Sequence, residues 1–299
     1  MLLPFGKLTF ALGFLLTLCF LDSASWSALE KRAVRVSDTT LFGEMDCFRV
    51  ETPSAIYLYG KRGAGFASIL DPQGHDWISY GPGNKARGEY RGLPKCGQPV
   101  KYFHCGYGFG QYTNDNWFAS TVTLREPGHV RIHSETRNGN SACDWDFFPD
   151  HAMLTLHRIG LPTFWFLYEG TPGGALDVAD DYVIRSDANA KKRTSLSEPW
   201  TGVTPLVVFG AKESSYALVC VNHQTNSPID SYVSWPYKAE VDGSLNDMTV
   251  FGFGRPGWTD SSQHQPQLRA LPAQFSIALC RATNGVGVAE QLGLAVANH

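Results

Sequence analysis

Three kinds of segment are missing from this 299-residue sequence. Beyond the first 21 residues there is no apolar run long enough to cross a membrane, and there is no low-complexity linker or internal repeat. There is also no basic stripe, and the formal net charge of −3 is no footprint for nucleic acid. These absences exclude a repeat protein, a nucleic-acid-binding protein and a membrane span in the body of the chain.

Several short motifs that mark common enzymes and sites are absent too. No G-x-S-x-G sequence is present, so the nucleophile elbow of an α/β-hydrolase is excluded. The alternating glycines of Gly106–Gly110 lie in no strand–G-x-G-x-x-G–helix unit, which excludes a dinucleotide site. There is no Cys-x-x-Cys pair, and the histidines lack zinc-site spacing. We therefore expect no cofactor; Asp177, Asp180 and Asp181 are of the type that holds a structural calcium, but a solvated turn is their ordinary interpretation.

The N-terminus has the pattern of a secretory signal. Lys7 precedes the apolar run Leu8–Leu21, and Ser23-Ala24-Ser25 supplies a cleavage site of small residues. The sequence Leu29-Glu30-Lys31-Arg32 resembles the kexin-type dibasic processing sites of fungal secreted proteins. We expect a secreted, extracellular protein without membrane attachment after cleavage, made as a signal peptide (1–25), a short propeptide (26–32) and one mature domain (33–299).

The mature sequence has the pattern of an all-β protein. Short apolar runs alternate with turns, and 30 glycines and 17 prolines supply the turn residues. A dozen or more strands in about 270 residues favour a large two-sheet antiparallel β-sandwich, expected here as a monomer. The helical spacing of apolar residues in Gly287–Ala297 predicts a short C-terminal helix.

A β-hairpin is predicted between Asp144 and Gly174. The apolar run His151–Arg158 and the aromatic run Thr163–Glu169 are separated by the Gly/Pro turn at 159–162. With a symmetric turn, His151 and Tyr168 share one face, whereas a slip of one residue places His151 opposite Glu169. The sequence leaves this register open.

One candidate site combines His151 and Tyr168 with Arg91 and His104 of the long segment Gly81–Gly110. This set suits β-elimination on a uronic-acid glycan, in which a guanidinium neutralises the uronate carboxylate while a base and an acid move protons. The alternative is that His151 and Tyr168 are ordinary strand side chains and that Arg91 ties down its own loop.

Carboxyl groups form a second candidate. Glu89, Asp144, Asp146 and Glu169 would serve glycoside hydrolysis if two of them lay roughly 5–10 Å apart. The aspartates are equally typical of turn caps, whereas the charge of Glu169 in an apolar run needs a partner such as Arg91 or Arg185. A third interpretation is glycan binding without catalysis through tryptophans in loops. Further expected substrate contacts are Glu89, Tyr90, Tyr107, Trp145 and Asp146.

Six cysteines remain once Cys19 leaves with the signal, and an even number in a secreted chain favours disulfides. We expect the pairs Cys96–Cys105, Cys220–Cys280 and Cys47–Cys143.

The segments FWFLYEGTPGG (Phe164–Gly174), MTVFGFGR (Met248–Arg255) and GEYRG (Gly88–Gly92) resemble parts of secreted microbial β-sandwich proteins. The overall pattern is similar to the large sandwiches of polysaccharide lyases and sugar mutarotases. This resemblance implies a carbohydrate-active protein whose partner is an extracellular polysaccharide or oligosaccharide, and it assigns no catalytic residue. We favour a polysaccharide lyase, with a glycoside hydrolase or a glycan-binding, wall-associated protein as alternatives.

Overall fold

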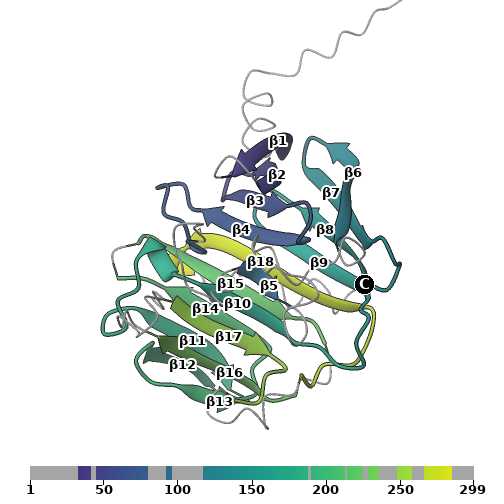
Figure 1. Cartoon of the computed structure of the whole chain (residues 1–299). Helices are drawn as coiled ribbons and strands as arrows, with labels where there is room; N and C mark the ends of the chain where they lie inside the picture. The colour runs from purple at the N-terminus through teal and green to yellow at the C-terminus, as the bar shows by residue number, and fades with distance from the viewer. Residues whose placement is uncertain are drawn as a thin grey trace, which may run out of the picture. The chain divides into compact units, whose positions relative to one another are not determined.

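The computed structural model describes residues 33–41, 45–79, 92–95, 117–187, 190–212, 214–224, 228–235, 248–257 and 266–284. In these ranges the chain forms two nine-stranded antiparallel sheets, with short 3-10 helices at Pro172–Gly174 and Ala282–Asn284 (Figure 1). The predicted all-β sandwich is confirmed. None of the helices in these ranges is long and apolar enough to cross a bilayer. The signal peptide, the propeptide and the helix predicted at Gly287–Ala297 lie outside the described residues.

Sheet 1 is built from five sequential N-terminal strands and four strands that come from later parts of the chain. In spatial order it contains β1 (Arg35–Leu41), β2 (Met45–Glu51), β3 (Ile56–Gly60), β4 (Gly65–Leu70), β5 (Gly92–Lys95), β10 (Phe166–Gly170), β17 (Met248–Phe253), β16 (Asp230–Trp235) and β13 (Trp200–Gly202).

Sheet 2 places the C-terminal strand β18 at its centre. In spatial order it contains β12 (Ala190–Ser195), β11 (Tyr182–Asp187), β14 (Leu206–Gly210), β15 (Tyr216–Asn222), β18 (Ala273–Arg281), β9 (Ala152–Arg158), β8 (Ala142–Phe147), β7 (His129–Thr136) and β6 (Phe118–Glu126).

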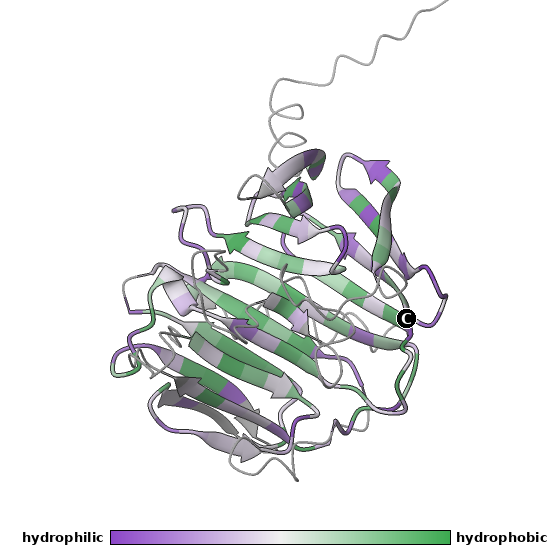
Figure 2. Cartoon of the chain, in the orientation of Figure 1, coloured by the Kyte–Doolittle hydropathy of each residue, from purple (hydrophilic) through white to green (hydrophobic). Residues whose placement is uncertain are grey.

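The core lies between the inner faces of the two sheets. Along β7 every second residue, such as Val130 and Ile132, is buried, because successive side chains of a strand point to opposite faces. Figure 2 shows this alternation of hydrophilic and hydrophobic residues on β6 and β7. Aromatic rings join the sheets across the core, with ring centroids 4.4 Å apart for Phe166 and Phe275 and 4.5 Å apart for Phe66 and Trp145.

The predicted hairpin is wrong, although both of its strands exist. Strand β9 pairs with β8 and β18 in sheet 2, and β10 pairs with β5 and β17 in sheet 1. The Gly/Pro segment between them therefore carries the chain from one sheet to the other instead of reversing it within a sheet. Of these two strands, β10 is buried on both faces and β9 is buried on one.

Several strands have a polar outer face and are therefore hard to recognise in the sequence. Asp144 and Asp146 belong to β8, a strand whose inner face is apolar. The polar segment 186–198 contains β12, which pairs with β11. By contrast, the segment after β4 forms only a single bridge, between Leu70 and Asp76. A polar outer face removes the apolar run by which such a strand is recognised.

The end of β10 has no room for a side chain. The Trp77 carbonyl oxygen accepts hydrogen bonds from the Tyr168 hydroxyl (2.7 Å) and the Thr171 N–H (3.0 Å), and a Cβ on Gly170 would come within 3.0 Å of that oxygen and of the Tyr168 ring. We expect Gly170→Ala to lower the free energy of unfolding by about 2–3 kcal/mol in urea titration. Gly128→Ala is the matched control, because a Cβ there meets no atom within 4 Å, and equal losses in both variants would contradict the packing argument.

Candidate functional site

Three side chains line the outer side of β10, the side that faces away from sheet 2. Phe166 and Tyr168 point into the core, so Leu167 and Glu169 point outward, and Trp165 continues this alternation. Glu169 is only 4% exposed and lies opposite Val250 of β17 and Gly92 of β5. A carboxylate is thus held in the middle of a sheet with little access to water.

Arg255 lies over the same surface because two glycines allow it. Gly252 lies opposite Leu167, and a Cβ there would come within 3.0 Å of both the Leu167 and Arg255 side chains. Gly254 adopts a positive φ of 73°, and its N–H donates to Asp230 Oδ1 at 2.8 Å. The Ser231 hydroxyl donates to the Arg255 carbonyl at 2.7 Å, which fixes the turn. We call Trp165, Leu167, Glu169 and Arg255 the Glu169 cluster.

The Glu169 cluster joins a base, a cation and an aromatic ring. Burial lowers the pKa of Arg255 to about 10, and the negative charge of Glu169 partly offsets this. The Arg255 guanidinium lies 4.7 Å from the centre of the Trp165 ring. Trp165 is 2% exposed, and among the described residues its indole N–H has no hydrogen-bond acceptor. The cluster therefore offers a proton acceptor and two kinds of donor on one face.

A second polar surface covers the outer face of β7, β8 and β9. It consists of residues that alternate with core residues, together with the turn between β8 and β9, and we call it the histidine face: His129, Arg131, His133, Glu135, Asp144, Asp146, Phe148, Asp150, His151 and His157.

Each of two carboxylates on the histidine face holds two basic groups. Asp144 accepts from His133 Nδ1 at 2.7 Å and from His157 Nε2 at 2.8 Å. Asp146 is nearly buried and accepts from His129 Nε2 and, at 2.8 Å, from Arg131 Nε. The two carboxylates have similar contacts because Asp144 and Asp146 lie on the same face of β8.

The turn between β8 and β9 carries a stack of three rings. The Phe148 ring lies 4.6 Å from the His129 ring and 4.7 Å from the His151 ring, centre to centre. His151 Nδ1 donates to Asp150 at 2.7 Å, and the Phe148 N–H donates to the His151 carbonyl at 2.8 Å. His151 is therefore part of a compact turn.

Asp144 makes the stability of this face depend on pH. Burial raises the pKa of Asp144, but the hydrogen bonds from His157 and His133 outweigh it and leave that pKa below its ordinary value of 3.8. Its stabilisation is therefore present above pH 3.8 and is lost as the pH falls through the lowered pKa.

We expect Asp144→Asn to be less stable than the native protein at neutral pH, with the gap closing as the pH falls below 3.8. Thermal unfolding at a series of pH values measures this gap in stability. The control is Asp46→Asn, because Asp46 is exposed. A gap that stays constant down to strong acid would contradict the assignment.

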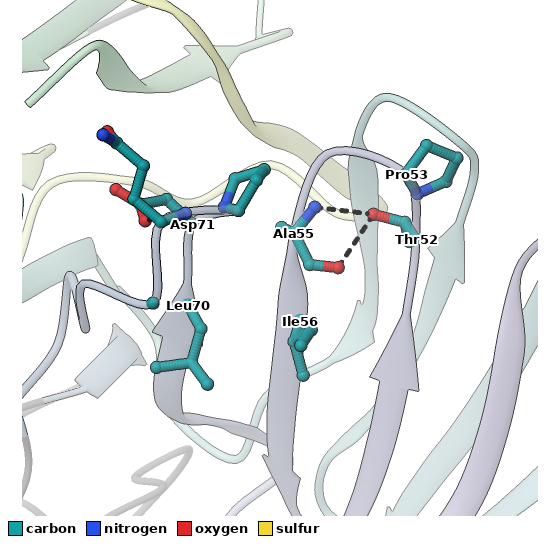
Figure 3. Close-up of a pocket in the computed structure, with 9 residues that line it drawn as sticks. Thr52, Pro53, Ala55, Ile56, Leu70 and Asp71 are labelled. Carbon is teal, nitrogen blue, oxygen red and sulfur yellow. Dashed lines mark hydrogen bonds between the residues drawn. The ribbon is translucent and has the colours of Figure 1, made fainter. Parts of the chain in front are cut away.

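A third feature is a cavity of about 340 Å³ beside the turns after β2 and β4 (Figure 3). Its walls include Pro53, Ile56 and Leu70, and the Thr52 hydroxyl is engaged with the N–H and carbonyl of Ala55, both at 3.0 Å. The carboxylate among the residues that line this cavity is that of Asp71, which is buried and is held by hydrogen bonds from its own loop. The cavity thus offers no available group for acid–base chemistry.

Asp71 is the structural centre of that loop. Its carboxylate accepts from the N–H groups of Gln73 (2.8 Å) and His75 (3.0 Å). It also accepts from three side chains: His75 Nδ1 (3.2 Å), the Trp77 indole N–H (3.2 Å) and the Ser214 hydroxyl (3.4 Å).

The structure distributes the predicted site residues over three places. Tyr168 and Trp145 are fully buried in the core, where the Trp145 indole donates to the Ala64 carbonyl at 3.2 Å. His151 and Asp146 lie on the histidine face of sheet 2, and Glu169 lies on the outer face of sheet 1. His151 and Tyr168 are therefore not brought together. Arg91, His104, Glu89, Tyr90 and Tyr107 lie outside the described residues.

Arg185 is not the partner of Glu169. Its guanidinium donates to the Thr194 hydroxyl at 2.9 Å and lies 4.8 Å from the centre of the Trp200 ring. Among the described residues, the charge of Glu169 acts on Arg255, 86 positions further along the chain, whereas the other expected partner, Arg91, lies outside those residues. Sequence reasoning missed Arg255 because only the pairing of β10 with β17 brings it close to Glu169. The histidine face was likewise missed, although H-V-R-I-H-S-E-T (129–136) alternates polar and apolar residues as a half-exposed strand does.

Two predicted disulfides are wrong, since the structure forms none between the cysteines it describes. Cys220 points into the core, whereas Cys280 packs against the apolar outer face of sheet 2. Likewise, Cys143 belongs to the core and Cys47 to a small cluster on the outer face of sheet 1. The pair Cys96–Cys105 lies outside the described residues.

The acidic turn considered for calcium is held by protein groups. Asp181 accepts from the N–H groups of Asp177 (2.8 Å) and Lys212 (3.2 Å), and burial raises its pKa to about 6. Within the described ranges no set of three or more His, Cys, Asp or Glu side chains is arranged to hold a metal ion.

Comparisons with known proteins concern the fold. No protein-family model and no curated protein matches the sequence. A solved structure of the protein HI1317 superposes with a TM-score of 0.52 at 12% identity, covering 82% of this chain and 100% of that chain. YeaD of Salmonella typhimurium, a candidate mutarotase, gives 0.47 at 12% identity over 82% and 94%. A galactose mutarotase-like protein of Clostridium acetobutylicum gives 0.44 at 8% identity over 83% and 98%. The likeness to the HI1317 structure concerns the fold alone.

Proposed function

We propose that this protein acts on carbohydrate, and that its reaction is β-elimination on a uronic-acid glycan at the Glu169 cluster. The observation that carries the proposal is the place of Glu169 and Arg255 on the outer face of sheet 1, where the negative charge of Glu169 acts on Arg255. The predicted secretory signal agrees with a polymeric substrate outside the cell.

The chemistry follows from the two charges. Arg255 would bind the uronate carboxylate and neutralise it, which makes the adjacent C5–H bond more acidic. Glu169 would take that proton while a C4–C5 double bond forms and the C4–O bond breaks. The departing oxygen takes a proton from the Glu169 carboxyl group or from water, so the step needs no further reactant.

Among the residues that the structure describes, which do not include Glu89, the groups on this face suit elimination better than hydrolysis. A glycosidase needs a second carboxyl group at roughly 5–10 Å. Asp230, another buried carboxyl group of sheet 1, accepts the N–H groups of Thr204 (2.9 Å) and Gly254 (2.8 Å) and is fully buried. Burial raises the pKa of Asp230 to about 7, but its oxygens are committed to the backbone. Asp144 and Asp146 lie on the other sheet.

The test exposes the purified full-length protein to a panel of acidic and neutral polysaccharides. Ultraviolet absorbance of an unsaturated uronate and the number of reducing ends are recorded together, with heat-inactivated protein as control. A rise in both signals on an acidic glycan alone is the expected result. Reducing ends without absorbance would replace the proposal by hydrolysis, and interconversion of aldose anomers without chain cleavage would replace it by mutarotation. No turnover in any of these assays would overturn it.

A further inference from the structure

We call Asp144, Asp146 and the basic side chains that contact them the centre of the histidine face. This centre carries more basic groups than carboxylates. Asp144 and Asp146 between them contact four basic side chains, listed here in chain order: His129, Arg131, His133 and His157. All four are accessible, with side-chain exposures of 22%, 43%, 36% and 38%. The carboxylates are the covered members, at 20% for Asp144 and 3% for Asp146. A ligand approaching this face therefore meets imidazole and guanidinium groups first.

The formal charge of this centre depends on how many of its imidazoles carry a second proton. With neutral imidazoles, Arg131 and the two carboxylates give a formal charge of −1. When the three imidazoles are protonated, the formal charge becomes +2. Histidine is the side chain that ordinarily makes this change between about pH 5 and 8.

The surrounding charges modify this effect without cancelling it. From β7 the Glu135 carboxylate contacts both Arg158 of β9 and, at 3.7 Å, His133 Nε2 of the centre. The turn contributes Asp150 with His151, and β6 contributes Glu126, which lies opposite His129. Beyond β9, strand β18 presents Gln274 and Ser276, which are uncharged, and His223 contacts Ser276 at 2.8 Å. Burial and His151 lower the pKa of His223 to about 4, so it stays neutral in mild acid.

We propose that the histidine face is a second, non-catalytic binding surface that holds an acidic polysaccharide in mildly acidic solution and releases it as the pH rises. The surface is open and crosses adjacent strands about 4.8 Å apart, which suits an extended polymer. Imidazolium and guanidinium groups donate to both the carboxylates and the hydroxyls of such a chain. The proposal concerns sheet 2 and stands whether or not the Glu169 cluster is catalytic.

The test measures binding of the full-length Glu169→Gln protein to immobilised polygalacturonate, so that turnover cannot remove the ligand. We expect the affinity at about pH 5 to exceed that at about pH 7.5 by at least ~10-fold. The double variant His133→Gln/His157→Gln should lose this gain. His75→Gln is the matched control, because His75 also contacts a carboxylate and is 40% exposed but lies away from the face.

A second readout follows the imidazoles themselves. By linkage, a ligand that prefers the protonated face must raise the pKa of His133 and His157, which NMR titration with and without polygalacturonate measures. Equal affinity at the two pH values, or an unchanged gain in the double variant, would overturn the proposal. Equal binding of polyglutamate at about pH 5 would refute recognition of a saccharide and leave only attraction between charges. If the double variant fails to fold, the native protein supplies the test. The proposal would then be overturned if adding polygalacturonate left the pKa of both histidines unchanged.

Discussion

Replacing Glu169 with glutamine is expected to lower the rate of β-elimination by about 10²–10⁴-fold. The amide has nearly the same shape as the carboxylate but cannot take the C5 proton. Initial rates of absorbance increase measure the effect on the glycan identified in the panel. Glu126→Gln is the matched control, since Glu126 is exposed at the end of β6 on the other sheet and should retain the native rate.

The same substitution leaves Arg255 without its neighbouring negative charge, so folding must be measured beside activity. Glu169→Asp provides the second variant, because it keeps the charge but withdraws the carboxylate by one methylene. We expect it to retain a thermal midpoint close to the native one and to lose activity through misplacement of the base. Native rates in both variants would exclude Glu169 as the base.

Asp71→Ala is expected to lower the free energy of unfolding by about 3–5 kcal/mol. The substitution removes the acceptor of two backbone N–H groups and of the Trp77 indole, and both Asp71 and Trp77 are buried. It also removes the link to Ser214, which ties the β4 loop of sheet 1 to the loop before β15 of sheet 2. Urea unfolding measures the loss.

Asp38→Ala is the control for this result. Asp38 also contacts a basic group, the Lys61 ammonium at 2.7 Å, but its side chain is 75% exposed and water replaces the partner. We expect no measurable change in its unfolding midpoint. Similar losses in Asp38→Ala and Asp71→Ala would show that burial of the Asp71 carboxylate is not what stabilises the loop.

The class of fold could be predicted from the sequence because it depends on local signals. Short apolar runs and turn residues locate β3, β4, β14, β15 and β18 within a few positions, and a two-sheet arrangement buries them. The pairing of strands could not be predicted in the same way. The turn between β9 and β10 has the composition of a hairpin turn, but which sheet a strand joins is decided by burial across the whole molecule.

The same distinction applies to the candidate sites. Glu169 could be singled out because a charge in the apolar run F-W-F-L-Y-E-G requires compensation. Its partner could not, because Arg255 approaches only through the turn beyond β17. Tyr168 was expected beside substrate, but its position in the alternation of β10 directs it into the core. A shift of one residue in the register of β10 would exchange the directions of Tyr168 and Glu169.

The strand order also has a consequence for biosynthesis. Strand β10 lies between β5 and β17, and β9 lies between β8 and β18, so each sheet is completed at its middle by the last strands of the chain. About 80 residues separate β10 from β17, which at ribosomal speeds of about 5–20 residues per second leaves β10 exposed on one edge for roughly 4–16 s. Closure of such distant contacts is intrinsically slow. The nascent protein therefore displays an aromatic strand edge until β17 is made, and chaperones that recognise such edges should assist its folding.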